Sequence, residues 1–231
     1  MIRQVIFDMD GLMIDSERKM WVINEKRVFK ELGYETQDSF LNSLMGQGKE
    51  HSVESIYNHY GLDFPMDEFY SRLYEYNRQS VERNEVPFKP GFEELLKFLK
   101  TTDIKLTVGT SSSKDYVYQI LNNLKVKDEF DHIICGDEVK HSKPDPDIYL
   151  KCMSYYNYDP QEVIVFEDAD AGGRAALAAK ARLIIVKDLS PISEYVESNA
   201  FKVLPSLDKA IDIIKLEIWE NHWLSEWDQN H

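Results

Sequence analysis

The sequence predicts an α/β fold in which a Rossmann-like parallel sheet carries an inserted helical segment. From residue 86 onward, helical patterns alternate regularly with short apolar runs, which is typical of a parallel sheet covered by helices on both faces. Another apolar run, Val5-Ile6-Phe7, stands near the N-terminus. Residues 15–85, between these parts, read as one helix after another. The expected division is an α/β core of residues 1–14 and 86–231 with a helical domain at 15–85.

Glycine and proline divide this pattern into individual elements. Ser16 is a candidate N-cap for a first helix that Gly33 ends. Three more helices are expected near residues 40–44, 49–60 and 66–83, with Gly61 and Pro65 between the last two. The core then alternates helices 92–101, 114–124, 145–156 and 171–180 with strands 105–109, 131–135, 163–166 and 183–186.

Composition restricts the function classes. The 231 residues are 43 % hydrophobic, which supports a packed core, and they carry 27 Lys and Arg against 41 Asp and Glu. The resulting net charge of −14 argues against a nucleic-acid partner, because binding to a phosphate backbone requires a broad basic surface. An anionic substrate would therefore depend on local positive charge.

The cysteines and the apolar runs indicate a cytoplasmic protein that binds no membrane. Cys135 and Cys152 suggest neither a disulfide framework nor a zinc site, so reduced thiols are expected. The N-terminus enters a strand at once and lacks the pattern of a signal peptide. No apolar run approaches the length needed to span a bilayer.

The stretch Asp8-Met9-Asp10-Gly11 follows the first apolar run and is the leading candidate for chemistry. Residues 8 and 10 point the same way on a strand, so two carboxylates and the carbonyl between them can converge on one cation. Such hard oxygen ligands suit Mg²⁺, whose coordination shell is commonly completed by substrate phosphate. The alternative is a solvated turn after a strand.

Three further polar clusters follow strands, where parallel sheets bind their ligands. Thr110 and Ser111 would hold a phosphoryl oxygen at a helix start, or merely cap that helix. Lys143 would neutralise phosphate charge, or remain a solvated surface lysine. Glu167 and Asp168 would complete a metal shell, or cap the following helix. All four clusters are expected at one edge of the sheet.

Together these motifs resemble the haloacid dehalogenase superfamily, in the branch of β-phosphoglucomutases and small-metabolite phosphatases with a helical cap domain. Four matches carry the resemblance in the family's order and span the whole core. They are Asp8-Met9-Asp10-Gly11, Thr110-Ser111, Lys143-Pro144, and Glu167-Asp168 with Gly172 and Ala175-Ala176.

The resemblance implies a role for each matched residue. Asp8 would be the nucleophile that forms an aspartyl-phosphate, and Asp10 would act as general acid and then general base. Mg²⁺ would bind the Asp8 carboxylate, the Asp10 main-chain carbonyl and Asp168, with Glu167 as a weaker ligand or just outside the shell. Thr110, Ser111 and Lys143 would hold the phosphoryl group. The implied activity is a Mg²⁺-dependent phosphomonoesterase for a small phosphorylated metabolite.

Three departures from the family pattern bear on this reading. Ala169 replaces a serine after the acidic pair, and Lys180 replaces the glycine that ends the next helix, at a backbone cost of about 1 kcal/mol if the left-handed conformation is kept. Met20 stands where β-phosphoglucomutases carry a histidine that activates a sugar hydroxyl. Hydrolysis is therefore favoured over a phosphomutase, unless His51 or His59 supplies that group. A non-catalytic phospho-acceptor module is a third alternative.

Two regions outside the core motifs have candidate roles. In the helical segment, Gly46 and Lys49 would contact the substrate anion, with an ordinary helix–helix turn as the alternative; Arg72 and Arg78 are weaker candidates. At the C-terminus, three tryptophans recur every four residues along one expected helical stripe. Core packing is the first interpretation and a dimer contact the second, in a protein otherwise expected to be a monomer. They are Trp219, Trp223 and Trp227.

Overall fold

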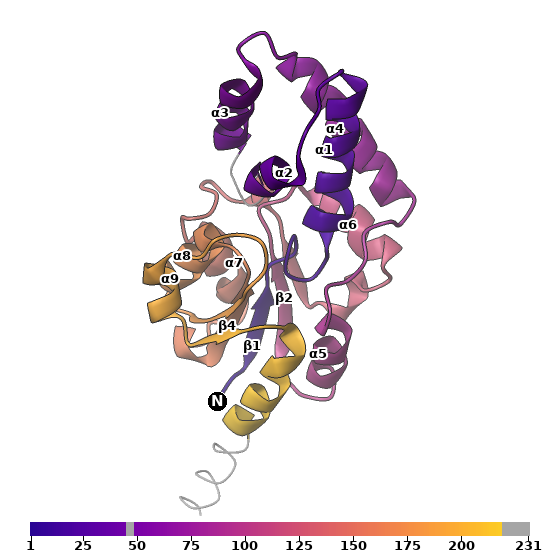
Figure 1. Cartoon of the computed structure of the whole chain (residues 1–231). Coiled ribbons are helices and arrows are strands. Elements are labelled where there is room, and N and C mark those ends of the chain that lie inside the picture. Colours follow the sequence, from indigo (N-terminus) through magenta and orange to yellow (C-terminus); the bar gives the residue numbers. More distant parts are fainter. Residues whose placement is uncertain (45–48, 219–231) are drawn as a thin grey trace, which may run out of the picture.

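A computed structural model describes residues 1–44 and 49–218, and within this part six parallel strands form one sheet (Figure 1). The prediction of an α/β fold is confirmed. The strand order is β3-β2-β1-β4-β5-β6, so the chain builds outward in both directions from the central β1. The carboxyl end of the sheet at such a reversal is where ligands bind in this class of fold. The strands are β1 Gln4–Phe7, β2 Lys105–Gly109, β3 His132–Ile134, β4 Val163–Glu167, β5 Arg182–Val186 and β6 Lys202–Leu204.

Helices cover both faces of the sheet, because successive side chains of a strand point to opposite sides. Val5 and Phe7 of β1 pack into one hydrophobic cluster, whereas Ile6 packs into another on the opposite face. The first cluster includes residues of α5 Phe92–Leu99, of α6 Lys114–Asn123 and of a helix over 210–218. The second includes residues of α7 Asp147–Ser154, α8 Asp170–Ala178 and α9 Glu194–Asn199 (Figure 1).

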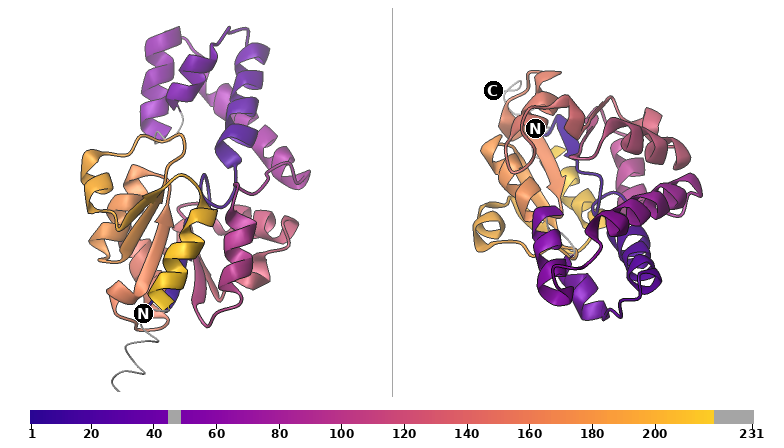
Figure 2. Two further views of the ribbon diagram at one scale, coloured as in Figure 1. Left: turned by 60° about the horizontal axis from the view of Figure 1, so that its bottom comes forward. Right: turned by 90° about the horizontal axis from the view of Figure 1, so that it is seen from above.

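A separate group of helices stands over the carboxyl ends of the strands (Figure 2). These helices pack around a cluster of their own, to which Phe29, Leu41 and Phe69 contribute. Trp21 packs against both this cluster and the sheet cluster that contains Val5. The group consists of a π-helix η1 Glu17–Trp21, α1 Val22–Glu31, α2 Asp38–Leu44, α3 Lys49–Tyr60 and α4 Met66–Glu82.

The two segments that connect these helices to the sheet run side by side. The Asp15 N–H donates to the Pro87 carbonyl at 2.9 Å, and the Lys89 N–H donates to the Met13 carbonyl at 2.9 Å. Ile14 and Phe88 form an antiparallel bridge between them. The chain therefore leaves the sheet and returns to it at one place.

Most expected elements lie within a few residues of the observed ones, and the differences are local. Gly33 follows α1 with a φ of 86°, which is the conformation expected of a helix-ending glycine. The expectation that Ser16 caps the first helix is wrong, because its backbone is already helical (φ −67°, ψ −38°) and its side chain makes no capping bond. The sequence reading also missed α9 and β6, which are short.

The described C-terminal helix packs on one face of the sheet and forms an ion pair with β5. Ile214 is buried in the first sheet cluster, and Arg182 of β5 forms an ion pair with Glu217. The tryptophan stripe expected to follow, at Trp219, Trp223 and Trp227, lies outside the described residues. Among the described helices, none has the length and apolar character required to cross a bilayer.

Candidate active site

The four predicted polar clusters lie at the carboxyl edge of the sheet, facing the helices of residues 17–82 (Figure 1). Asp8 directly follows β1, and its N–H continues the sheet by donating to the Phe166 carbonyl of β4 at 3.0 Å. Lys143 follows β3, and Glu167 is the last residue of β4. Parallel packing of the central strands thus brings together side chains that are distant in the sequence.

Lys143 joins three of these strand ends. Its Nζ donates to Asp8 Oδ1 at 2.5 Å and to Glu167 Oε1 at 2.7 Å. It also donates to the Gly109 carbonyl, at the end of β2, at 3.2 Å. The Lys143 side chain is only 8 % exposed, so these contacts replace the water that an ammonium group would otherwise bind. The interpretation of Lys143 as a solvated surface lysine is therefore wrong.

Glu167 is held by more than this ion pair. Its Oε1 also accepts from the buried Tyr149 hydroxyl at 2.6 Å, while its Oε2 accepts from the N–H groups of Asp168 and Ala169 at 3.0 and 3.2 Å. Gly172, in the first turn of α8, leaves room for the carboxylate: a Cβ there would lie 1.7 Å from Glu167 Oε1. The Glu167 carboxylate is thus fixed by the local fold, and it fixes Lys143 in turn.

Asp168 is buried beside Glu167, and one of its carboxylate oxygens lacks a hydrogen-bond donor among the described residues. It is 2 % exposed, and its Oδ1 finds no hydrogen-bond donor in the described part of the chain. Gly11 makes close approach possible, because it has a φ of 84° and a Cβ there would lie 2.2 Å from Asp168 Oδ2. A buried carboxylate oxygen without a donor is costly, so a cation is the fitting partner.

Asp8, Glu167 and Asp168 form a group of carboxylates that could hold a metal ion. Ligand atoms of the three lie within 4.8 Å of one another, and all three residues are buried. One ammonium group, on Lys143, accompanies the three carboxylates, so two negative charges remain uncompensated when all are ionised. A divalent cation with a preference for oxygen ligands, such as Mg²⁺, fits this donor set and this charge.

The pKa shifts reflect the same excess of negative charge. Burial raises the pKa of Asp8 to about 8, although Lys143 opposes the rise and Glu167 adds to it. The pKa of Asp168 is also raised well above its ordinary value. Burial is the largest cause, and the negative charges of Glu167 and Asp8 add to it. For Lys143, burial acts to lower the pKa, but the two carboxylates raise it above its ordinary value. Lys143 therefore stays charged, and a bound cation would favour the ionised carboxylates.

The Asp10 side chain is held apart from the three carboxylates. Its Oδ2 accepts from the Ser112 hydroxyl at 2.7 Å and its Oδ1 accepts from the Tyr116 hydroxyl at 2.9 Å. The sequence reading missed both partners. Ser112 belongs to the serine run after β2 and could have been included, but Tyr116 lies inside α6 and has no signal that distinguishes it from a packing residue.

Thr110 and Ser111 lie in the loop after β2, next to the Gly109 carbonyl that binds Lys143. Thr110 is buried, and its hydroxyl oxygen accepts the Ser112 N–H at 3.1 Å, which stabilises the turn. Ser111 is exposed, and its carbonyl lies so close to Gly136 that a Cβ there would be 2.1 Å from the oxygen. The loop is thus fixed in place with an exposed serine at its tip.

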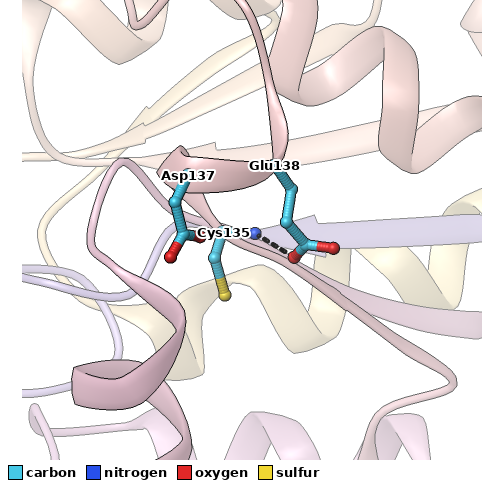
Figure 3. A group of neighbouring side chains, drawn as sticks. All are labelled: Cys135, Asp137 and Glu138. Carbon is cyan, nitrogen blue, oxygen red and sulfur yellow. Dashed lines mark hydrogen bonds between the residues drawn. The ribbon is translucent and has the colours of Figure 1, made fainter.

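A second group of possible metal ligands supports this loop (Figure 3). Glu138 accepts the Cys135 N–H at 3.0 Å, and Asp137 accepts the Lys114 N–H at the start of α6 at 3.0 Å. Burial, with the charges of Glu138 and Asp137, raises the pKa of the Cys135 thiol to about 12. Both carboxylates already bind the backbone and the thiol stays protonated, so this group has a structural explanation without a metal.

The candidates in the helical segment give a mixed result. Gly46 lies outside the described residues, and so does the side chain of Lys49, whose backbone begins α3. Arg72 forms ion pairs with Glu68 and Glu31. Arg78 forms ion pairs with Glu75 and Glu82, while also lining a cavity beside Asp10. These arginines are thus paired with carboxylates of their own helical group.

The positions that bear on the choice between hydrolase and mutase are also defined. Met20 is fully buried, packs into the sheet cluster and lines the same cavity. His59 is exposed at the end of α3 and stacks on Phe40, with ring centroids 4.1 Å apart. His51 is exposed on the same helix.

Comparison with known proteins gives consistent matches over most of the chain. The sequence profile of the haloacid dehalogenase-like hydrolases matches residues 5–186. A phosphorylated carbohydrates phosphatase of Thermotoga maritima is 29 % identical over 213 residues, which cover 91 % of this chain and 97 % of that protein. Hexitol phosphatase B of Escherichia coli K12 is 29 % identical over 187 residues, covering 80 % and 83 %.

Solved structures share the arrangement of sheet and helices. The crystal structure of a β-phosphoglucomutase from Clostridium difficile superposes with a TM-score of 0.70 at 25 % identity, and the match covers 97 % of this chain and 100 % of that one. The relatives thus include both phosphatases and a phosphomutase on one fold.

Proposed function

Because the chain belongs to the haloacid dehalogenase-like hydrolase family, we propose that it is a Mg²⁺-dependent phosphomonoester hydrolase that works through an aspartyl-phosphate. The observation that carries the proposal is the contact of Lys143 with both Asp8 and Glu167, beside the partnerless carboxylate oxygen of Asp168. A carboxylate nucleophile, a buried ammonium group and carboxylates that can hold a divalent cation are the groups that phosphoryl transfer requires.

Asp8 acts as the nucleophile. A carboxylate oxygen of Asp8 forms a bond to phosphorus, and the bond between phosphorus and the leaving oxygen breaks. Lys143 already lies against Asp8, so its charge eases the approach of an anionic substrate to an anionic nucleophile. Thr110 and Ser111, in the loop beside Gly109, hold the phosphoryl oxygens together with Lys143.

Asp10 transfers the protons. In the first step its protonated carboxyl gives a proton to the leaving alkoxide, which departs as an alcohol. In the second step its carboxylate takes a proton from water, which attacks the aspartyl-phosphate and releases inorganic phosphate and Asp8. The contacts from Ser112 and Tyr116 define where this carboxylate rests between the steps.

The metal would be held by Asp8, Asp168 and the main-chain carbonyl of Asp10, with Glu167 as a weaker ligand or just outside the shell. When bound, Mg²⁺ supplies positive charge to the phosphoryl oxygens. Asp168 Oδ1, which lacks a donor, is the atom that most needs it.

The substrate is proposed to be a small phosphorylated metabolite. The similar proteins act, by their names, on phosphorylated carbohydrates and hexitol phosphates. Residues 15–85 are the proposed cap, which would close over the phosphoryl site and exclude water. Gly46 and Lys49 remain its proposed contacts to the substrate anion.

A β-phosphoglucomutase activity is the second candidate, since a structure of that enzyme shares the fold. Met20 favours hydrolysis, because the buried thioether at the cavity wall can neither donate nor accept a proton. The deciding experiment supplies β-glucose 1-phosphate, Mg²⁺ and a catalytic amount of the bisphosphate. Free phosphate is expected to exceed glucose 6-phosphate, and the reverse would favour the mutase.

The proposed chemistry is tested with Asp8→Asn and with a chelator. Phosphate release from a panel of sugar phosphates and nucleotides should disappear in Asp8→Asn and after chelation, and return when Mg²⁺ is added. Asp212→Asn serves as the matched control, because it removes a carboxylate that is 90 % exposed and lies outside the proposed site. Near-normal kcat in Asp8→Asn would overturn the assignment, and a stable aspartyl-phosphate without turnover would favour a phospho-acceptor module.

A further inference from the structure

A cavity of about 590 Å³ opens beside Asp10, between the helical segment and the sheet domain. This volume is in the range of small-molecule binding sites. Its walls come from η1 and α4 on one side and from the loop after β2 and α6 on the other. The lining residues that the argument uses are Met20, Trp21, Tyr74, Asn77, Val81 and Gln119.

The cavity combines aromatic and apolar surface. The rings of Trp21 and Tyr74 meet edge to face, with centroids 6.2 Å apart and an interplanar angle of 87°. Met20 and Val81 add buried apolar surface to the same wall. Arg78, Ser113 and Asp115 add polar groups elsewhere in the lining, so the aromatic wall is the feature that favours a flat ring, which packs best against it.

Amide groups give the cavity a specific hydrogen-bonding capacity. Asn77 is 5 % exposed, and its Oδ1 accepts from Asn24 at 2.8 Å. Its Nδ2 donor, in contrast, finds no acceptor in the described part of the chain. Gln119 of α6 faces the same space. An acceptor on a bound ligand would satisfy the buried Asn77 donor, and the edge of a heterocycle carries such acceptors.

The position of the cavity beside Asp10 indicates that it binds the leaving group of the substrate. This step rests on the proposed function, in which Asp10 protonates the leaving oxygen. The leaving alcohol must then lie on the side of Asp10, while the phosphoryl group lies on the side of Asp8 and Lys143. Asp10 lines the cavity, so a leaving group there is within reach of the proton donor.

We propose that this cavity binds the leaving group and selects phosphomonoesters whose alcohol carries a planar heterocycle, so that 5′-ribonucleotides are preferred over simple sugar phosphates. Trp21 and Tyr74 contact the ring, and Asn77 and Gln119 bind its polar edge. Stacking of a base on an aromatic side chain corresponds to roughly 5- to 150-fold in affinity. Discrimination of at least about fivefold is therefore expected.

The test compares uridine 5′-monophosphate with ribose 5-phosphate. The two substrates share the phosphoryl group and the primary leaving oxygen and differ by the base. We expect kcat/KM for uridine 5′-monophosphate to be at least about fivefold higher. Equal values, or a preference for ribose 5-phosphate, would overturn the inference while leaving the phosphatase itself intact.

Substitutions of the two aromatic residues test whether they cause the preference for uridine 5′-monophosphate. Trp21→Leu and Tyr74→Leu should bring the ratio of the two kcat/KM values toward one. Trp21 packs into two hydrophobic clusters, so thermal unfolding is measured alongside; Tyr74 is 46 % exposed and its replacement should leave the fold intact. Tyr195→Leu, an exposed tyrosine of α9 outside the cavity lining, is the control and should keep the ratio. An unchanged ratio in Tyr74→Leu would contradict the proposal.

A binding measurement separates the cavity from the chemistry. Uridine, which has no phosphate, should bind the wild-type protein in calorimetry and bind Tyr74→Leu at least about fivefold more weakly. If no phosphomonoester is hydrolysed, the proposed function fails, and uridine binding still decides the inference. Absence of uridine binding together with equal turnover of both phosphates would refute it.

Discussion

Gly172→Ala should disable the phosphoryl site, although it replaces one small helical residue by another. In a helix interior this substitution ordinarily stabilises by about 1 kcal/mol. Here the new Cβ would lie 1.7 Å from Glu167 Oε1 and 2.5 Å from Oε2, far inside any real contact. Glu167 would have to move, although four groups hold it: Lys143, Tyr149 and the N–H groups of Asp168 and Ala169.

The magnitude follows from those contacts. Overpacking a buried site costs about 1–3 kcal/mol, and displacing a charged group from its hydrogen bonds costs about 1.5–3 kcal/mol more. Even the lower sum exceeds the gain in helix propensity, so net destabilisation of about 1.5–5 kcal/mol is expected, with a loss of several degrees in Tm. Because Glu167 also positions Lys143, phosphatase kcat/KM should fall by at least about 100-fold.

The neighbouring glycine is the matched control. A Cβ at Gly173 would lie 2.5 Å from Val196 Cγ1, so Gly173→Ala crowds the apolar side of the same helix. It should lower Tm as well, yet leave kcat/KM within about threefold of wild type, since no site residue is displaced. Both variants are compared by thermal unfolding and by phosphate release under saturating Mg²⁺. Wild-type Tm and kcat/KM in Gly172→Ala would refute the reasoning.

Three further predictions concern single side chains. Tyr116→Phe removes one of the two hydrogen bonds to the Asp10 carboxylate, so kcat for phosphate release should fall by about tenfold. Lys180→Gly should raise the free energy of unfolding by about 1 kcal/mol, or Tm by about 2–4 °C, because Lys180 holds a φ of 64° after α8. Glu25→Gln should raise Tm increasingly between pH 5 and pH 8. Burial, followed by the charge of Glu17, raises the pKa of Glu25 to about 8, so its ionisation destabilises the folded state progressively as pH rises above the unfolded value.

The first two of these predictions have a control variant, and the third is checked by its pH dependence. Tyr118→Phe, two residues along α6, should leave kcat unchanged, and equal losses in both variants would deny Tyr116 a special role. Lys180→Ala removes the same side chain but keeps the backbone cost, so a gain equal to that of glycine would argue against strain. For Glu25→Gln, a Tm gain that is constant with pH would show that charge is not the cause.

The sheet and its strand-end clusters could be predicted because they depend on local patterns. Buried strands are continuous apolar runs, and the rule that parallel strands present their carboxyl ends at one edge brings Asp8, Lys143 and Glu167 together without knowledge of their contacts. The elements that were missed, α9 and β6, are too short to show a period.

The details of the site depend on distant packing, which the pattern does not encode. Tyr116 and Tyr149 have the spacing of ordinary helix residues, and only their hydroxyl contacts to Asp10 and Glu167 distinguish them. The close approach at Gly172 and the cavity beside Asp10 are likewise consequences of tertiary structure. The extent of the cap, residues 15–85, stays a prediction.

The paired linkers give the helical segment an unusual topological status. The backbones of Asp15 and Lys89 each bind the opposite linker, so the two linkers are paired like the strands of a β-hairpin. The whole insertion then takes the place of the hairpin turn. The entropy of closing a loop grows only slowly with its length, so once these ends are paired, the size of what lies between them matters little to the sheet. Evolution can therefore replace the helical segment at this point without changing the sheet. A different segment over the same carboxyl edge would contact different substrates.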